Sequence, residues 1–310
     1  MESGHKEKWV FIVNPIAGNG FGKTMVPEIR QKIRKYQING EVIMTEGPGH
    51  ASELSGLYAE KGTRYIIAVG GDGTMNEVAR PLLNNRKVTT GIIPAGSGND
   101  FNQIPGFPNR FKEDDWEVFF RKNEIALDVG IVNETAFLNG MGLGFDAEVA
   151  AQNYTAAGKV RKGGKDKYIW HIVKTLLFFK EKKMIVVTDK EHLEANCFMN
   201  TVAVGRRFAG SFFLTPQAIA NDGLLDVCSI KKLNLFHRFR LLLKVPKGTH
   251  INDKRVKYFR ASEIHLEFPQ KVPYHVDGEL YFAMTFNIRV IPGCLNIIYN
   301  PDGKHYFARQ

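Results

Sequence analysis

The pattern of residues 65–77, YIIAVGGDGTMNE, constrains the fold more than any other stretch of the chain. Residues 65–69 are aromatic, branched or small and apolar, which is typical of a strand buried on both faces. A glycine-rich turn follows, and the spacing of Thr74 and Glu77 predicts a capping box with the helix beginning at or beside Thr74. A buried strand, a tight turn and a helix in this order indicate an α/β domain.

The turn between this strand and helix is suited to binding a phosphate. Backbone N–H groups at a helix N-terminus lack intrahelical partners, and the helix dipole favours negative charge there. Asp72 does not fit this interpretation, because its carboxylate would repel a phosphate unless a divalent cation lies between them. The plainer alternative is a capped strand-to-helix turn without a ligand.

Length and composition indicate an ordinary globular protein of two domains. The chain has 310 residues, of which 44% are hydrophobic and 24% charged, and a chain of this length exceeds one typical domain. We expect no secretory signal in the polar start MESGHKEK, and no apolar run reaches the roughly 18 residues of a membrane helix. The widely spaced cysteines predict buried thiols in a reducing compartment: Cys197, Cys228 and Cys294.

The net charge of +10 is concentrated in the second part of the chain. Residues 1–127 carry 16 Lys and Arg against 15 Asp and Glu, whereas residues 128–293 carry 24 against 16. A basic surface of this kind favours anionic lipid, nucleic acid or a phosphorylated ligand as partner.

The glycine-rich segment 16–24, IAGNGFGKT, closely resembles a phosphate-binding P-loop without matching it. Gly22-Lys23-Thr24 fits the end of the motif, but Ala17 occupies the position of the first glycine, and the nearby Gly18 leaves the loop one residue short. Because a P-loop needs a fixed length to wrap a phosphate, we do not predict a working P-loop.

Strands and helices alternate through the first part of the chain. A second glycine loop, AGSGND at 95–100, follows a predicted strand and leads toward another helix, and Pro81 predicts a kink or an early end in the helix before it. This alternation predicts a doubly wound, mostly parallel α/β nucleotide-binding domain with its ligand at the carboxyl ends of the strands. The predicted strands are 8–13, 41–45, 65–69 and 88–94, and the predicted helices are 26–36, 51–62 and 74–84.

The pattern changes after about residue 125 to short β-rich segments bounded by turns, which predict a mainly antiparallel, sandwich-like second domain. We therefore divide the chain into an α/β domain at 1–127 and a β-rich domain at 128–293. A strand at 295–299 in the tail 294–310 could return to either domain. The β segments are 125–132, 184–188, 198–204, 224–230, 263–268, 274–282 and 286–291, interrupted by helices near 168–180 and 234–244.

Two motifs in combination, VGGDGTMNEV (69–78) and PAGSGNDF (94–101), resemble the diacylglycerol kinase catalytic-domain family, which includes bacterial soluble lipid kinases and sphingosine kinases. The upstream NPIAG (14–18) resembles the NPxxG signature of that family, and its later motifs are matched in order by LDVG (127–130), NDGLLD (221–226) and VDGE (276–279). GGDGT alone also occurs in NAD kinases and phosphofructokinases, so the combination carries the resemblance. One departure is Asn102-Gln103, where bacterial members often have Ala-Arg.

The resemblance implies a site for ATP and magnesium. Asp277 would be the general base for the lipid hydroxyl, with Asp72 and Glu279 as its catalytic partners. A structural magnesium would bind Asp222 and the carbonyls of Ile219 and Leu224. An acidic set around magnesium and the phosphates would comprise Asp72, Asp100, Asp128 and Glu279. The ATP contacts would be Asn14, Pro15, Ile16, Ala17, Gly18, Thr45, Gly70, Gly71, Asp72, Gly73, Thr74, Met75, Asn76, Ser97 and Asp100.

Plainer interpretations exist for several of these acids. On spacing alone Asp277-Gly278 predicts a hairpin turn between two β runs, and Asn221-Asp222-Gly223 predicts another turn. Asp128 could be a strand-end carboxylate.

The basic, aromatic-rich segment 158–183 suits an anionic membrane surface. The alternative is that the apolar face of its helix packs on the sheet while its lysines are solvated. The second helix is predicted to be a core helix, since five apolar residues recur at helical spacing: Leu235, Phe236, Phe239, Leu242 and Leu243.

Taken together, the sequence predicts a lipid kinase that moves the γ-phosphate of ATP to a lipid hydroxyl. It would be cytoplasmic, transiently associated with the inner face of the membrane, with no nucleic-acid partner expected and a homodimer left open. The alternatives are a kinase of a soluble acceptor such as NAD, and a catalytically silent nucleotide- or lipid-binding module. The sequence does not identify the acceptor lipid.

Overall fold

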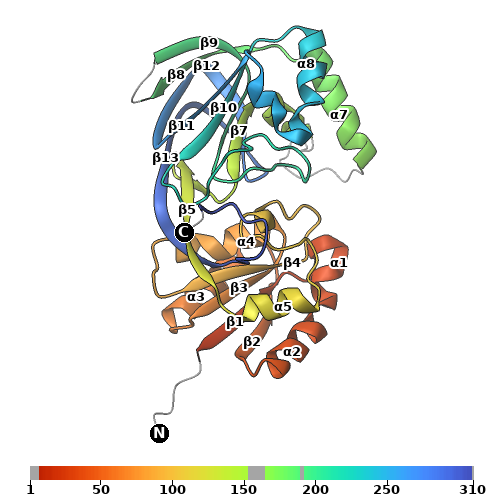
Figure 1. The fold of residues 1–310 in the computed structure, drawn as a ribbon, viewed down its shortest axis with the longest axis vertical. Helices are drawn as coiled ribbons and strands as arrows, with labels where there is room; N and C mark the ends of the chain where they lie inside the picture. The colour runs from red at the N-terminus through yellow and green to blue at the C-terminus, as the bar shows by residue number, and fades with distance from the viewer. Residues whose placement is uncertain (1–6, 153–164, 189–191, 309–310) are drawn as a thin grey trace. The chain divides into compact units, whose positions relative to one another are not determined.

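The computed structural model describes residues 7–152, 165–188 and 192–308, and the chain forms two compact units (Figure 1). The first unit contains the chain through Val129, the short segment Ala220–Asp222 and the chain from Pro292 onward. The second unit contains Gly130–Ile219 and Gly223–Ile291. The first unit is α/β and the second is β-rich, as predicted, although the inclusion of Ala220–Asp222 in the first unit was not expected.

The first unit is built on a parallel sheet in the order β2-β1-β3-β4. The last part of β13 adds a fifth parallel strand, with Asn296 opposite Thr89 of β4. Every residue of β3 and β4 is buried, as the apolar run at 65–69 predicts. The bounds are β1 (Lys8–Val13), β2 (Asn39–Met44), β3 (Tyr65–Gly70), β4 (Thr89–Pro94), β5 (Glu124–Val132), which forms a hairpin with β6 (Thr135–Phe137), and β13 (Glu279–Ile298).

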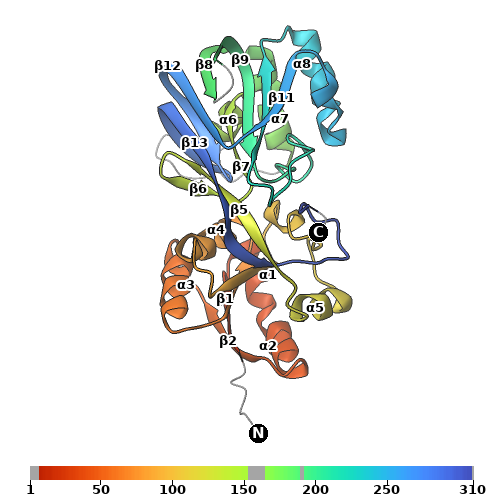
Figure 2. The ribbon, with the colours of Figure 1, turned by 60° about the vertical axis from the view of Figure 1, so that its left-hand side comes forward.

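Helices cover both faces of this sheet (Figure 2). On one face, Ile29 and Trp116 pack in a cluster with Trp9, Phe11 and Ile67 of the strands. On the other face α3 and α4 pack together, and the Ser55 hydroxyl donates to the Val78 carbonyl at 2.7 Å. The helices are α1 (Ala17–Thr24), α2 (Val26–Lys35), α3 (His50–Glu60), α4 (Asp72–Ala79) and α5 (Glu113–Phe120), with 3-10 turns η1 (Arg80–Leu82) and η2 (Phe101–Gln103).

The start of α4 differs from the prediction. The helix begins at Asp72 with Gly71 at its N-cap and without a side-chain cap, so the predicted capping box at Thr74 and Glu77 is wrong. Thr74 lies inside the helix, where its hydroxyl accepts a hydrogen bond from the Asn14 side chain at 3.1 Å. A tertiary contact therefore uses the residue that local sequence assigns to the cap. The early end at Pro81 is confirmed, because α4 stops at Ala79.

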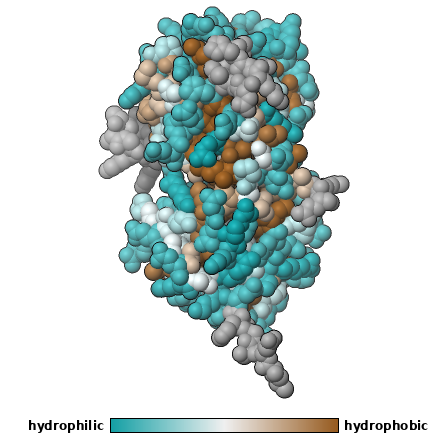
Figure 3. Space-filling model, turned by 90° about the vertical axis from the view of Figure 1, so that its left-hand side faces the viewer, coloured by the Kyte–Doolittle hydropathy of each residue, from teal (hydrophilic) through white to brown (hydrophobic). Residues whose placement is uncertain are grey.

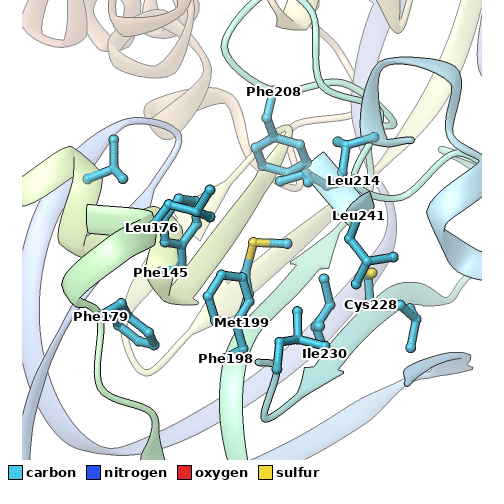
Figure 4. Close-up of a cluster of buried hydrophobic side chains, with 14 of the residues drawn as sticks. Phe145, Leu176, Phe179, Phe198, Met199, Phe208, Leu214, Cys228, Ile230 and Leu241 are labelled. Atoms are coloured by element: carbon cyan, nitrogen blue, oxygen red, sulfur yellow. The ribbon is translucent and has the colours of Figure 1, made fainter. Parts of the chain in front are cut away.

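The second unit is an antiparallel sheet in the order β11-β10-β9-β7-β12-β13, with β8 between β12 and β9 on a side branch. Its helices cover a core that includes Phe145, Leu176, Phe179, Phe198 and Leu241 (Figure 4). The strands are β7 (Gly140–Gly144), β8 (Lys182–Thr188), β9 (His192–Ala203), β10 (Leu225–Lys231), β11 (Val256–Ala261) and β12 (Glu263–Val276). The helices are α6 (Phe145–Ala151), α7 (Lys165–Phe178) and α8 (Leu235–Leu242), with 3-10 turns η3 (Val245–Lys247) and η4 (Thr249–Asn252).

Several elements of both units differ from the sequence prediction. The predicted strand 274–282 is two strands joined at residues 277–278, and the tail strand 295–299 is the end of the long β13. The loop 95–100 leads into the short η2 instead of an α-helix. The strands β7 and β11 and the helix α6 were not predicted, since β7 (GMGLG) contains three glycines and lacks strand-forming residues.

The prediction that α8 is a core helix is wrong. Its buried residues are Arg238 and Leu241, whereas Phe236 is 70% exposed and Phe239 and Leu243 are also exposed. In the part of the chain that the structure describes, no helix is both long enough and apolar enough to span a membrane. Residues 158–164 of the basic segment lie outside the described residues.

Candidate active site

Three loops that follow β1, β3 and β4 are joined to one another at the carboxyl end of the parallel sheet. The N–H of Asn14 donates to the Val69 carbonyl at 2.9 Å, and the N–H of Ala95 donates to Gly70 at 2.7 Å. The N–H of Thr45, after β2, donates to Val13 at 2.8 Å. These bonds extend the sheet ladder by one residue, so the predicted ATP-binding segments start from fixed positions.

Asp72 connects the two glycine loops. One carboxylate oxygen accepts the N–H of Asp100 at 3.1 Å and the other accepts the N–H of Phe101 at 2.9 Å. Burial raises the pKa of the Asp72 carboxyl above its ordinary value, while the N–H groups of Phe101 and Asp100 act in the opposite direction. The carboxylate that seemed out of place in the sequence thus has a structural partner in the next loop.

Two glycines allow these loops to approach closely. A Cβ on Gly96 would lie 2.4 Å from the Cα of Gly71 and 2.8 Å from the Asn99 side-chain oxygen. That oxygen accepts the N–H of Gly96 at 3.1 Å, and the Asn99 side chain donates back to the Gly96 carbonyl at 2.9 Å. A side chain on Gly96 would force the loops apart, because its nearest atom is backbone, whereas a Cβ on Gly71 would lie 3.1 Å from the Cα of Gly96 and require only a small shift.

The loop after β1 belongs to the same assembly. Asn14 donates from its side chain to Thr74 at 3.1 Å and accepts the N–H of Ile16 at 3.2 Å. Gly18 has a φ of +58°, and a Cβ there would lie 2.2 Å from the Ala95 carbonyl oxygen. Residues 18–20 all have positive φ inside α1, so the segment is a helix interrupted by a left-handed turn.

The predicted ATP-binding residues therefore lie on connected loops of one unit. Gly73, Ser97 and Ile16 are exposed beside the first turn of α4, while Met75 and Asn76 are buried. The first turn of an eight-residue helix presents N–H groups without intrahelical acceptors. The arrangement can bind an anion, and the role of each residue in binding ATP stays a prediction.

Asp128 is a buried residue within β5 and does not lie at the strand end. Its side chain accepts the N–H of Gly293 at 2.7 Å, and its own N–H donates to the Ala220 carbonyl at 2.9 Å. Asp128 is only 2% exposed. Its hydrogen bonds connect β5 to the segments that contain Ala220 and Gly293, which are distant from it in sequence.

Ile219, Asp222 and Leu224 lie in the turn that precedes β10. The turn is held by the C-terminal segment, because the Asn221 side chain accepts the N–H of Ala308 at 2.8 Å and Ala220 donates to Tyr306 at 2.9 Å. The predicted structural magnesium at this turn stays a prediction.

Asp277 and Gly278 form the turn between β12 and β13, and both have positive φ, at 46° and 90°. The prediction of a hairpin turn at Asp277-Gly278 between two strands is therefore confirmed. The Asp277 carboxylate also accepts three backbone N–H groups, from Leu138 at 2.7 Å, Asn139 at 3.1 Å and Gly140 at 2.8 Å. These bonds hold its oxygens in a fixed orientation beside β7.

Glu279 begins β13 and accepts the Tyr281 hydroxyl at 2.6 Å. Two nearby residues were not identified from the sequence: His275 lies 3.3 Å from the Asp146 carboxylate, and both are largely buried. The spacing of His275 and Asp277, two residues apart at a predicted strand end, is the signal that could have drawn attention to this pair.

Within residues 7–152, 165–188 and 192–308, no group of three or more His, Cys, Asp or Glu side chains is arranged to hold a metal ion. Asp72, Asp100 and Asp128 belong to the first unit, and Glu279 belongs to the second. The acidic set that the resemblance implies around magnesium stays a prediction.

Comparison with protein families identifies both parts of the chain. Residues 8–132 match the diacylglycerol kinase catalytic domain, and residues 140–299 match the YegS C-terminal NAD kinase beta sandwich-like domain. The chain belongs to the diacylglycerol kinase catalytic-domain family. It is therefore a phosphotransferase, and the family resemblance predicted from its motifs is confirmed.

Similar proteins of the family match over most of their length. A diacylglycerol kinase of Bacillus subtilis is 29% identical over 275 residues, which cover 86% of this chain and 88% of the relative. A Shewanella frigidimarina protein named "probable lipid kinase YegS-like" is 24% identical over 92% of this chain and 93% of the relative.

Solved structures share the fold. A crystal structure of a diacylglycerol kinase from Bacillus anthracis has a TM-score of 0.73 at 20% identity and covers 97% of this chain and 100% of that one. Another structure from the same organism has a TM-score of 0.79 at 23% identity and covers 98% and 100%. The arrangement of elements in the family thus extends along nearly the whole chain.

The close contact of the glycine loops gives a testable prediction. Gly96→Ala should lower the free energy of unfolding by about 1–3 kcal/mol, because its Cβ meets backbone that cannot move aside. Gly73→Ala is the matched control, since its Cβ meets nothing within 4 Å, and it should be neutral or stabilising by up to about 1 kcal/mol. Urea denaturation measures both, and equal effects of the two variants would contradict the loop contact.

Proposed function

We propose that the protein transfers the γ-phosphate of ATP to a hydroxyl group of a membrane lipid. The observation that carries the proposal is the connection of the three loops at the start of α4, with Asp72 bonded to the loop of Asp100. In a chain of the diacylglycerol kinase family, a rigid glycine-lined assembly beside a helix N-terminus supports binding of a nucleotide triphosphate.

Phosphoryl transfer depends on positioning and on stabilising charge, so the nucleotide site must be built before the substrate arrives. The loops of this unit meet that requirement, because their contacts are backbone bonds and carboxylate–amide bonds that do not involve a ligand. In the proposal the phosphates lie against the exposed glycines and Ser97, and residues 14–18 and Thr45 border the nucleotide.

Magnesium would neutralise phosphate charge and fix the orientation of the triphosphate. Magnesium in kinases takes one or two protein carboxylates, with phosphate oxygens and waters as its other ligands, and does not require a cage of protein side chains. One carboxylate oxygen of Asp72 accepts the N–H of Asp100 and the other accepts the N–H of Phe101, and a carboxylate oxygen has two lone pairs with which to accept hydrogen bonds or bind a cation. Asp72 and Asp100 are therefore our first candidates, with Asp128 and Glu279 as the further acids of the proposal.

Asp277 is the proposed general base. A base must hold its carboxylate in place while it takes a proton from the acceptor hydroxyl, and the three N–H bonds from residues 138–140 supply that rigidity. The same bonds also support the plainer role of an anchor for the hairpin turn. The two roles are separable, because only the base requires a carboxylate that can be protonated.

A lipid acceptor is supported by the names of the relatives and by the basic balance of residues 128–293. We further propose a cytoplasmic protein that visits the inner face of the membrane. NAD is the second candidate acceptor, favoured by the NAD kinase-like description of the C-terminal domain. A silent module is disfavoured because it would have no need of the five acids that the family resemblance names, and all five are present: Asp72, Asp100, Asp128, Asp277 and Glu279.

The variant Asp277→Asn distinguishes the proposed role of Asp277 as general base from its role as an anchor of the hairpin turn. Asparagine tolerates the positive φ of 46° and keeps one oxygen to accept backbone N–H groups, so the turn should persist. Loss of the base should lower turnover by about 10²–10⁴-fold with little change in ATP affinity. Glu134→Gln is the matched control, since Glu134 is an exposed carboxylate in the β5–β6 turn, after Asn133 with a φ of 54°. Wild-type turnover of Asp277→Asn would exclude the role of base.

The acceptor is tested by incubating the protein with γ-labelled ATP and magnesium and a panel of acceptors. The panel contains diacylglycerol, a sphingoid base, ceramide, phosphatidylglycerol, a polyprenol and NAD. We expect label in one or more lipids and none in NAD. Label in NAD alone would establish the soluble acceptor and contradict the lipid kinase.

A further inference from the structure

The surface of α8 is reversed relative to an ordinary amphipathic helix of a globular protein. A helix at the surface normally buries its apolar stripe and exposes its charges. In α8 the buried residues are Arg238 and Leu241, while Phe236 and Leu243 are 70% and 79% exposed. Phe236, Phe239 and Leu243 are spaced by three and four residues, so they form one stripe on the face opposite Arg238.

Arg238 explains how α8 is held in this orientation. Its guanidinium donates to the carbonyls of Leu176 at 2.6 Å and Phe179 at 2.9 Å, and to Glu181 at 2.8 Å. It also lies 5.2 Å from the centre of the Phe198 ring. Because these acceptors come from the end of α7 and the residues that follow it, α8 is fixed against α7 and cannot rotate to bury its apolar stripe.

The neighbouring α7 buries one apolar face and exposes further large apolar side chains on another. Ile172, Leu176 and Phe179 point into the core of the second unit, and Trp170 and Phe178 are 63% and 75% exposed. Figure 1 shows α7 and α8 side by side in the second unit, and their contacts agree with it. Large apolar groups are therefore exposed on two adjoining helices. We define the α7–α8 surface as Trp170, Leu177, Phe178, Leu235, Phe236, Phe239 and Leu243.

The charge around this surface favours one kind of partner. Residues 231–247 contain six Lys and Arg and no Asp or Glu, and Lys174 and Lys180 are exposed on and beside α7. Apolar side chains bordered by cations match the boundary of an anionic bilayer, where acyl chains lie beneath negative headgroups. A second copy of the chain would bring the same cations together, so charge opposes self-association through this surface.

We propose that the α7–α8 surface is the membrane-docking surface of this protein, that α8 inserts Phe236 and Leu243 into the headgroup–acyl boundary, and that Arg238 presents the stripe. The inference rests on the proposed lipid kinase function and adds to it the surface that contacts the bilayer. It assigns α8, which the sequence placed in the core, to the membrane interface.

The test compares two double variants of the whole protein in sedimentation with vesicles of phosphatidylcholine and phosphatidylglycerol in a 7:3 ratio. Phe236→Ala/Leu243→Ala shortens the proposed anchor. Phe282→Ala/Met284→Ala is the matched control, since Phe282 and Met284 are exposed apolar residues of β13 in the same unit, where apolar surface is also visible on another face (Figure 3). Thermal unfolding of both variants checks that each is folded.

We expect the α8 variant to lose vesicle affinity by about tenfold or more, and the β13 variant to stay within about twofold of wild type. Lys231→Gln/Lys232→Gln should weaken binding to anionic vesicles and reduce its salt dependence, with no effect on pure phosphatidylcholine vesicles. Equal losses in the α8 and β13 variants, or none in either, would overturn the docking surface. So would a wild-type dimer that the α8 variant converts to a monomer in analytical ultracentrifugation.

A kinase assay distinguishes failure of this inference from failure of the proposed function. The α8 variant should phosphorylate a water-soluble short-chain diacylglycerol at the wild-type rate and long-chain diacylglycerol in vesicles at about a tenth of it or less. Loss of vesicle activity with unchanged vesicle binding would overturn the docking role alone. Absence of lipid phosphorylation by the wild type, with α8-dependent vesicle binding, would refute the kinase proposal and leave the docking surface intact.

Discussion

The contact of the Asp72 carboxylate with the N–H groups of Asp100 and Phe101 is the constraint on which the candidate site depends. It ties the first turn of α4 to the loop after β4, and the glycines at 71 and 96 permit the approach. Burying a carboxylate without hydrogen-bond donors costs free energy. Here two backbone N–H groups donate to the Asp72 carboxylate and offset that cost. The phosphate-binding loops are thereby arranged before any nucleotide arrives.

A carboxylate bonded to backbone N–H groups also occurs in the second unit. Asp277 occupies a tight turn and accepts three backbone N–H groups, which fixes a carboxylate at the end of a hairpin. Arg238 is the cationic counterpart: its buried guanidinium donates to the carbonyls of Leu176, Phe179 and Leu233 and to the Glu181 carboxylate. In each case an ionised side chain gains from bonds to rigid backbone groups, and the exposed surface around it is left for ligands or partners.

Local pattern was sufficient for much of the fold and for the family. The apolar run at 65–69, the Pro81 stop and the paired glycine loops predicted β3, the end of α4 and the positions of the loops, because each depends on residues near in sequence. The start of α4 and the exposure of α8 were predicted wrongly. Both depend on partners distant in sequence, Asn14 for Thr74 and the end of α7 for Arg238, and helical spacing cannot tell an apolar stripe facing the core from one facing a membrane.

Binding of the ATP phosphates by the connected loops of the first unit is tested by hydrogen–deuterium exchange of the whole protein with and without ATP and magnesium. We expect slower exchange at residues 70–76 and 95–101, with β10 and β11 unchanged, since bound phosphate would protect the amides at the start of α4 and in the second glycine loop. Unchanged exchange in both segments at saturating ATP, or protection confined to the second unit, would contradict it.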